Sequence, residues 1–421
     1  MMNSWHCGRS ADPDLSHRRV RSARPAWAAG ALVALLLGCA ETVAPPAAPP
    51  SAPAVQAVPF PDAVLNAANA VLSGAAAAVP PGGARQVVVI DPLVNGMTGE
   101  QSAATRQIGE RIAALAREKY PQFDIQPFSA AAVSKGPNVM VGTFTPVNAQ
   151  GQTAGTREAY RFCLVMVDLR AGKTIAKGVA RAKQDGVNAT PTGFFRDSPA
   201  WTNDPSVKSY IDTCQATKVG DAISPTYVNG IVTASVISEA IDAYNGSRYH
   251  EALDLYTTAQ KMPAGNQLRV HNGIYLANWK LGRREQAAEA FGRVVDYGLE
   301  NNALGVKITF RPGSTAFAAD QRSSGPYDMW IKQIAEHSAR KSACLQVTGH
   351  SSPSGSSAIN DQLSQLRAEY VKGQLETNSP GLRGHVIATG VGAKNNLIGT
   401  GADDVTDALD RRVEFKTIPA C

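Results

Sequence analysis

Six cysteines and seven histidines supply the side chains that most often bind metals or act as nucleophiles. No two cysteines form a Cys-x-x-Cys pair, and no two histidines have the spacing of ligands on one helix, which argues against a zinc site. The four cysteines beyond residue 100 neither stand beside a histidine nor open an evident helix, which argues against a catalytic thiol. We therefore expect no metal ion and no cysteine chemistry beyond disulfides.

His350 precedes a loop rich in serine, a combination that raises the question of Ser–His hydrolysis. The serines are Ser351, Ser352, Ser354, Ser356 and Ser357. That chemistry also needs an acid that orients the histidine, and the sequence offers none at an identifiable position, so we interpret His350 as a packing or hydrogen-bonding residue. A second motif, Gly172-Lys173-Thr174, is similar to the end of a phosphate-binding loop. Val167 stands where that loop requires glycine, so we expect neither enzymatic activity nor a cofactor.

The N-terminal segment has the layout of a secretion signal. A basic stretch at residues 17–24 precedes an apolar run at residues 27–37, which is too short to span a bilayer but suits the apolar part of a signal peptide. The run ends in Leu36-Leu37-Gly38-Cys39, which resembles the bacterial lipobox. The resemblance implies that residues 1–38 are removed and that Cys39 carries the lipid. Because Ala40 and not aspartate follows, it also implies anchoring in the outer membrane, facing the periplasm.

The remaining cysteines are suited to disulfides. Removal of Cys7 with the signal peptide and lipidation of Cys39 leave Cys163, Cys214, Cys344 and Cys421. An even number of cysteines in an oxidising compartment permits two disulfides. Pairing within the predicted segments gives Cys163–Cys214 and Cys344–Cys421, which is one of three connectivities.

Composition sets limits on the rest of the chain. Hydrophobic residues make up 44% of the 421 residues and charged residues 18%, which favours packed domains. The net charge is +6, but five arginines and two aspartates in the signal segment supply +3, and 36 basic against 33 acidic residues remain. So small an excess argues against nucleic acid as a partner. Seven prolines between residues 41 and 62 indicate an extended linker, which we assign with the anchor to residues 39–83.

Residues 84–215 alternate between strand and helix patterns. Strands are expected at 86–92, 139–144, 160–167 and 174–182, with a helix at 103–120 and a hairpin turn at 168–173. This segment resembles the α/β domain of CsgG-like, TolB N-terminal-like and LpoB-like envelope lipoproteins. The matching residues are 88–91 with Asn95-Gly96, and Val167-Asp168 with Gly172-Lys173.

Residues 225–298 are helical with a period of 35. The repeated positions are Tyr249, Ala252, Tyr256 and Ala259, followed by Arg284, Ala287, Phe291 and Val294. The segment resembles tetratricopeptide repeats, in which a small alanine lets paired helices approach while an aromatic residue fills the groove. Two hypotheses stay open: a helical spacer packed on its neighbours, or a groove for a protein partner.

Residues 304–418 resemble the OmpA-like peptidoglycan-binding domain. The family pattern is a strand end Gly-His-Thr-Asp, a helix Asn-x-x-Leu-Ser-x-x-Arg-Ala and a closing strand Asn-Arg-Arg-Val. The counterparts here are Gly349-His350-Ser351-Ser352, residues 360–368 and residues 410–413. Periodicity independently favours the order β-α-β-α-β-β, and the recurring apolar positions of its second helix are Leu363, Leu366, Val371 and Leu375.

The resemblance implies a ligand, the diaminopimelate side chain of the wall stem peptide, which presents an ammonium beside a carboxylate. In the family, the aspartate binds the ammonium and the helix arginine binds the carboxylate. Arg367 stands at the arginine position, but Ser352 replaces the aspartate. Losing a charge-assisted hydrogen bond costs about 1.5–3 kcal/mol, or roughly ten- to hundredfold in affinity.

Two hypotheses follow for this domain. In the first, weakened binding persists through Arg367, Asn360, Asp361 and loop amides, helped by the many sites of a polymeric wall. In the second, the domain has a structural or protein-binding role, and Arg367 could equally be an arginine on a helix surface. Because Arg411 and Arg412 alternate across the last strand, we expect only one of them, assigned as Arg412, to face the ligand and the other to face solvent.

These observations predict a multidomain protein of the α/β and α+β classes: an α/β domain, TPR-like hairpins and an OmpA-like domain. We expect an outer-membrane lipoprotein that links the membrane to peptidoglycan without catalysis. The alternative is a regulatory or assembly lipoprotein whose α/β and TPR-like segments bind a peptidoglycan synthase or a secretion-system partner.

Overall fold

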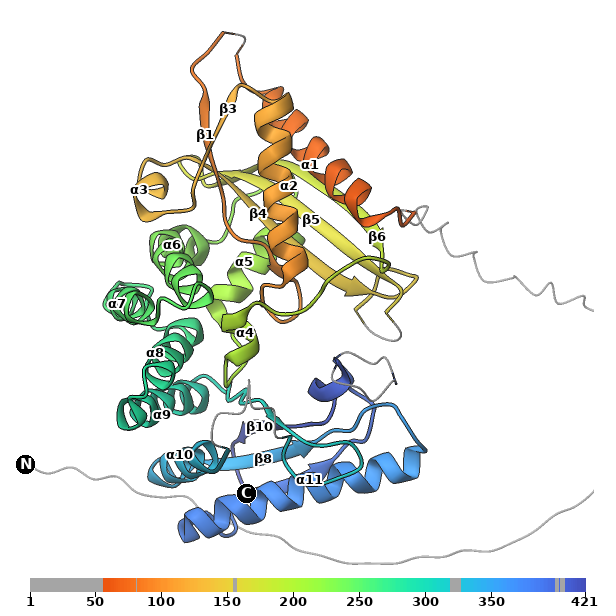
Figure 1. Cartoon of the computed structure of the whole chain (residues 1–421), viewed down its shortest axis with the longest axis vertical. Coiled ribbons are helices and arrows are strands. Elements are labelled where there is room, and N and C mark those ends of the chain that lie inside the picture. The colour runs from red at the N-terminus through yellow and green to blue at the C-terminus, as the bar shows by residue number, and fades with distance from the viewer. Residues whose placement is uncertain (1–55, 81, 154–156, 319–326, 398–400, 402–405) are drawn as a thin grey trace, which may run out of the picture. The chain divides into compact units, whose positions relative to one another are not determined.

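The computed structural model describes residues 56–421 apart from 81, 154–156, 319–326, 398–400 and 402–405 (Figure 1). The predicted signal peptide, Cys39 and the first part of the linker therefore lie outside the described residues. Among the described helices, none has both the length and the apolar character that crossing a membrane requires.

The first sheet combines parallel and antiparallel strands in the order β3-β1-β4-β5-β6, with β2 paired to β4. β1 runs parallel to β3 and β4, whereas β4, β5 and β6 form an antiparallel meander. The strands are β1 (Gln86–Ile90), β2 (Val94–Asn95), β3 (Phe123–Gln126), β4 (Asn138–Val147), β5 (Ala159–Asp168) and β6 (Lys173–Lys183). The predicted hairpin turn is present, with Asp168 Oδ1 accepting the amide of Arg170 at 2.8 Å.

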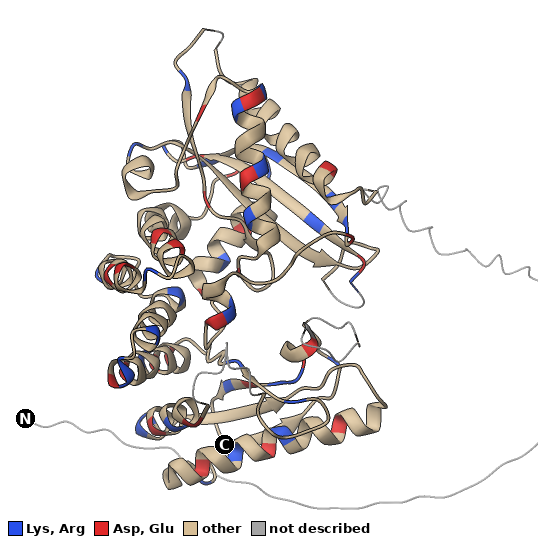
Figure 2. Cartoon of the chain, viewed as in Figure 1, with Lys and Arg blue, Asp and Glu red and all other residues tan. Residues whose placement is uncertain are grey.

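Helices cover both faces of this sheet, which suits the mostly apolar strands β1, β4 and β5, whereas β6 carries basic residues along its length (Figure 2). Alternate residues such as Val88 and Met140 face helices α1 (Phe60–Ala76) and α2 (Ala103–Lys119). Their neighbours Val89 and Val139 face the other side, which is packed by α3 (Ala130–Val133), α5 (Pro205–Gln215) and part of α6 (Pro225–Asn245). The short helix α4 (Gly193–Asp197) precedes α5.

The prediction that residues 39–83 form an anchor and linker was wrong in part, because residues 60–76 form helix α1 of the folded domain. Pro61 lies in the first turn, where proline is tolerated, and the alanine-rich sequence that follows favours a helix. Ala63, Ala67 and Ala68 are fully buried against the sheet. A side chain at Gly178 of β6 would overlap the carbonyl of Ala67, so this glycine permits the close approach of α1.

Four antiparallel helices follow: α6, α7 (Tyr249–Gln260), α8 (Leu268–Lys280) and α9 (Arg284–Glu300). The two predicted repeat starts, Tyr249 and Arg284, open α7 and α9. The small and aromatic repeat positions Ala252, Tyr256, Ala287 and Phe291 are fully buried. The ring of Tyr256 lies directly against Gly273 of α8, where a β-carbon would overlap it. The residues that recur with the 35-residue period are therefore those that pack the helices against one another.

The C-terminal segment follows the predicted order β-α-β-α-β-β. Its elements are β7 (Ile308–Thr309), α10 (Tyr327–Arg340), β8 (Cys344–Gly349), α11 (Ser357–Asn378), β9 (Val386–Gly390) and β10 (Arg412–Ile418), with 3-10 helices η1 (Pro380–Leu382) and η2 (Thr406–Leu409). The strand order is β7-β10-β8-β9, with β8 parallel to β9 and β10 antiparallel to β7 and β8.

The helical and C-terminal segments share one hydrophobic core, which extends from α6–α9 through α10 to β8 and β10. At its centre Phe291 of α9 stacks on Trp330 of α10 with ring centres 5.6 Å apart. The α/β domain also contacts the start of the C-terminal segment: the amide of Trp201 donates to the carbonyl of Gly305, and a salt bridge of 2.6 Å joins Lys307 to Glu100. This packing supports the spacer hypothesis for the helical segment.

The structure joins the cysteines within segments. Cys163 of β5 is bonded to Cys214 of α5, and Cys344 of β8 is bonded to Cys421. Of the three connectivities that the sequence leaves open, this is the pairing within predicted segments. Each disulfide ties a strand to a distant part of the same segment.

Candidate functional site

The residues predicted to bind the wall peptide surround the loop that follows β8. Arg367 and Asn360 lie on α11, Ser352 lies in the loop itself, and Arg412 opens β10. All four are buried, with exposed fractions of 0% for Arg367, 6% for Asn360, 4% for Ser352 and 3% for Arg412.

Two glycines let α11 lie directly on the strand ends. A β-carbon at Gly349 would overlap the carbonyl oxygen of Ser364, and one at Gly390 would crowd the backbone of Gln365. The buried face of α11 is polar or small at Asn360, Ser364, Arg367 and Ala368 and becomes apolar at Val371 and Leu375. The predicted apolar face was wrong at Leu366, whose exposed fraction is 44%.

Arg367 holds backbone carbonyls from two loops. Nη1 donates to His350 at 3.0 Å, Nε to Ser314 at 3.0 Å and Nη2 to Arg311 at 3.1 Å. The guanidinium carbon also lies 5.2 Å from the ring centre of Phe310. The hypothesis of a surface arginine is therefore wrong. In this structure Arg367 organises the loops around the site.

Arg412 has a similar role on the other side of His350. Its backbone oxygen accepts the amide of His350 at 2.9 Å, while Nε donates to Glu414 at 2.8 Å and Nη2 to the carbonyl of Asn395 at 3.2 Å. The backbone of His350 thus connects both predicted arginines, since its carbonyl accepts from Arg367.

Arg411 differs from the prediction. We expected one of the paired arginines to face solvent, but Arg411 is 4% exposed and donates from Nε to the carbonyl of Phe310 at 3.2 Å. The segment around Phe310 covers one side of the start of β10, and the loop around Asn395 covers the other. Both arginines are therefore buried, on opposite sides of the strand.

Glu414 adds an anionic group to the site, one that lies outside the predicted set of binding residues. Its Oε2 lies 3.4 Å from Nε2 of His350, and its other oxygen accepts from Arg412. Burial acts to raise the pKa of Glu414, but the interactions with His350 and Arg412 outweigh burial and lower this pKa to about 2. Glu414 is therefore ionised at every physiological pH.

The loop after β8 is held to the loop after β9 by backbone contacts. The amide of Ser351 donates to Gly392 at 3.0 Å, and Nδ2 of Asn396 donates to the carbonyl of Ser351 at 2.9 Å. Ser352 Oγ lies 3.1 Å from Ser354 Oγ. Three buried polar atoms here, Nδ1 and Nε2 of His350 and Oγ of Ser351, have no hydrogen-bond partner among the described residues, although Nε2 lies 3.4 Å from Glu414. Such groups commonly mark a place where water or a ligand completes the bonding.

One group of side chains has the composition of a metal site. The ligand atoms of Cys344, His385 and Cys421 all lie within 4.8 Å of one another. The two cysteines are joined in a disulfide, so their sulfur atoms are not thiolates. In this oxidised form the group does not offer the ligands that zinc prefers.

Comparisons with known proteins give a coarse result. No family model matches the chain, and no curated protein matches it. Among solved structures, the chain is similar to the peptidoglycan-associated lipoprotein from Burkholderia pseudomallei, with 23% identity and a TM-score of 0.23, over 27% of this chain and 89% of that one. It is also similar to the cell wall anchor of the T6SS from Pseudomonas aeruginosa, with 25% identity and a TM-score of 0.21, over 26% of this chain and 74% of that one.

The alternation of side chains along a strand is a sequence signal for Glu414. Residues two apart on a strand lie on the same face, so a strand from Arg412 onward places Glu414 beside Arg412. The role of the His350 backbone had no such signal. It depends on the approach of α11 to Gly349, which involves no recognisable side-chain pattern.

Proposed function

We propose that the protein is a periplasm-facing, outer-membrane lipoprotein that binds peptidoglycan non-covalently through its C-terminal segment. The main support for this proposal is the hydrogen-bond network around the backbone of His350, in which Arg367 and Arg412 hold the loop that contains Ser352. The ligand class, the diaminopimelate stem peptide, comes from the resemblance of the motifs around these residues to the OmpA-like domain.

The geometry modifies the roles that the resemblance implies. Because Arg367 is fully buried and already donates to three carbonyls, we assign it the positioning of the loops. Ser352, Asn360 and the unpartnered Ser351 hydroxyl then supply hydrogen bonds to the ligand. Glu414 keeps a negative charge near His350, which favours an ammonium group in the vicinity.

The proposal is tested by co-sedimentation of residues 40–421 with purified peptidoglycan. This chain keeps every described residue, and it avoids cutting the core shared by α9 and α10. We expect the native chain to sediment weakly and to be released by free diaminopimelate. Ser352→Asp should tighten binding by about tenfold to hundredfold, since it restores a charge-assisted bond.

Two matched arginine variants distinguish the positioning role of Arg367 from a general effect of positive charge on binding. Arg367→Lys keeps the charge but cannot donate to three separated carbonyls, so we expect weaker binding. Arg383→Lys is the control because Arg383 is exposed. If neither the native chain nor Ser352→Asp sediments while circular dichroism shows both folded, peptidoglycan binding is wrong and protein partners become the question.

A further inference from the structure

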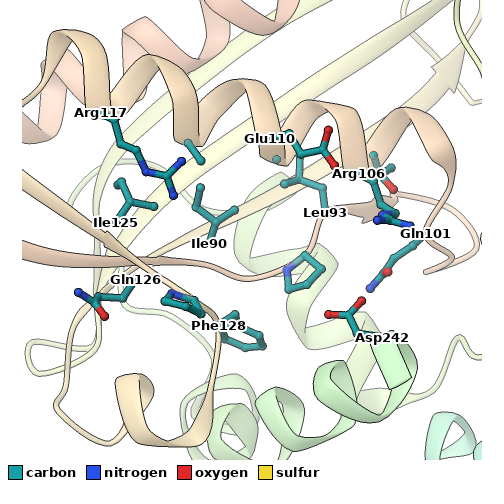
Figure 3. A pocket seen from close by; sticks show the side chains of 15 residues that line it. Ile90, Leu93, Gln101, Arg106, Glu110, Arg117, Ile125, Gln126, Phe128 and Asp242 are labelled. Atoms are coloured by element: carbon teal, nitrogen blue, oxygen red, sulfur yellow. The ribbon is translucent and has the colours of Figure 1, made fainter. Parts of the chain in front are cut away.

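A cavity of about 370 Å³ lies in the α/β domain, remote in sequence from the proposed wall-binding residues. It opens where the parallel strands β1 and β3 end, beneath α2, and Asp242 of α6 borders it (Figure 3). Ligands of α/β sheets commonly bind at the carboxyl ends of parallel strands, and the volume is within the range of small-molecule sites. Position and size therefore both suit a ligand.

The floor and one wall of this cavity are apolar or small. Ile90, Leu93, Ile125 and Phe128 supply apolar side chains at the strand ends. Gly109 and Ala113 of α2 form the wall, and a β-carbon at Gly109 would meet no atom within 4 Å. This combination leaves room for an apolar body lying along the helix.

Charged groups stand at the two ends. Arg106 and Arg117 are eleven residues apart on α2, about three turns or roughly 16 Å, so both lie on the cavity side of the helix. No hydrogen bond or ion pair joins the guanidinium of Arg117 to another described residue. At the other end, Asp242 lies near Arg106 and Gln101 (Figure 3), and burial raises the pKa of Asp242 although the charge of Arg106 opposes the rise.

We propose that this cavity binds a short peptide of about five residues with free termini. The carboxylate of the peptide pairs with Arg117, because a guanidinium fork suits a carboxylate. Its ammonium pairs with Asp242, and its apolar side chains lie on the floor formed by Ile90, Leu93, Ile125 and Phe128. An extended peptide of five residues spans roughly 16 Å, which matches the separation along α2 between Arg117 and Arg106, the residue near Asp242 (Figure 3). A simple anion suits the site less well, because Asp242 and Glu110 also border it.

The test is calorimetric titration of residues 40–421 with two five-residue peptides, pentaalanine and Ala-Ala-Leu-Ala-Ala. Each peptide is used with free termini, with an acetylated amino end and with an amidated carboxyl end. We expect at least one free peptide to bind, and each terminal modification to weaken it by about tenfold to hundredfold. Failure of both free peptides, or equal binding of the blocked forms, would overturn the proposal. Equal binding of octanoate would mean a general anion site instead.

Variants of α2 locate the binding. Arg117→Gln should remove most of the affinity, and Gly109→Leu should block the cavity. The leucine enters open space and improves helix propensity, so the fold should be kept. Lys119→Gln, at the exposed end of the same helix, is the matched control and should bind like the native chain. Unchanged binding by folded Gly109→Leu contradicts the assigned cavity, and sedimentation with peptidoglycan should be unaffected by all three variants.

Discussion

The indole nitrogen of Trp330 donates a hydrogen bond of 2.9 Å to the hydroxyl of Tyr275. Trp330 belongs to α10 of the C-terminal segment, and Tyr275 belongs to α8 of the helical segment. Both rings also contact Phe291 of α9, at 5.6 Å between ring centres in each case. Because this aromatic group is buried, the two segments should unfold together.

Trp330→Ala is expected to destabilise both segments. Removing a buried tryptophan costs about 3–5 kcal/mol, and here it also leaves the Tyr275 hydroxyl without its indole donor. Hydrogen exchange followed by mass spectrometry should show faster exchange in α8 as well as in α11. Faster exchange confined to α10 would mean that the segments are energetically independent. Phe123→Ala, in the separate core of the α/β domain, is the comparison and should leave exchange in α8 and α11 unchanged.

The free energy of unfolding should decrease between about pH 4 and pH 7, because the buried Asp91 must lose a proton over this range. Burial raises the pKa of Asp91 from 3.8 to about 7, although the hydrogen bond from Tyr227 and the charge of Arg269 oppose it. The folded state therefore holds a proton that the unfolded state loses above pH 4, so this contribution is present at low pH and is lost by about pH 7. The free energy of unfolding lost through this group between pH 4 and pH 7 is about 4 kcal/mol at most.

Asp91→Asn should remove this pH dependence, since asparagine can still accept from the hydroxyl of Tyr227. Urea unfolding at pH 5 and pH 8 measures the effect. We expect the variant to equal the native chain at low pH and to exceed it at pH 8. An unchanged difference between the two pH values would assign the dependence to other groups.

The disulfide between Cys163 and Cys214 should contribute strongly to the α/β domain. It joins β5 to α5 across 51 residues, and loss of such a bond costs about 2–5 kcal/mol. Mass spectrometry of unreduced peptides should find this pair and the pair Cys344–Cys421. Four free thiols in the native protein would contradict both assignments. The double variant Cys163→Ser with Cys214→Ser should lower the midpoint of thermal unfolding.

Cys39→Ser should release the protein from the membrane, because the lipobox-like sequence Leu36-Leu37-Gly38-Cys39 implies that the thiol of Cys39 carries the lipid. Fractionation of cells followed by immunoblotting measures the result. The matched control is Cys7→Ser, which changes a cysteine of the predicted signal peptide and should leave attachment intact. Retention of Cys39→Ser in the outer-membrane fraction would exclude a lipid anchor at this position.

Regular periodicity made much of the fold predictable. The strands β1, β4, β5 and β6 and helix α2 follow apolar patterns of the expected period. Helix α1 was not predicted from the sequence, because alanine and proline together suit both an extended linker and a helix with a proline in its first turn. Strand β3 is too short to show a period.

The candidate site was predictable only in its residue types. Motifs around Ser352, Arg367 and Arg412 identified the region, but burial reversed the expected exposure of Arg411 and Leu366. The two errors have separate causes. The segment around Phe310 covers Arg411. The close approach of α11 to Gly349 and Gly390 turns Ser364 and Arg367 inward and leaves Leu366 outside.

The pairing of Val58 with strand β6 sets how far the folded protein can lie from its predicted anchor. Val58 pairs with β6 on both sides, donating to Arg181 at 3.0 Å and accepting from Lys183 at 2.9 Å, so the chain is fixed from that residue onward. If Cys39 carries the lipid, 58 − 39 = 19 residues connect it to the fold, with a maximum length of about 70 Å. Wall contact is then limited to peptidoglycan close beneath the outer membrane, and lengthening this connection should extend the gap that the protein can bridge.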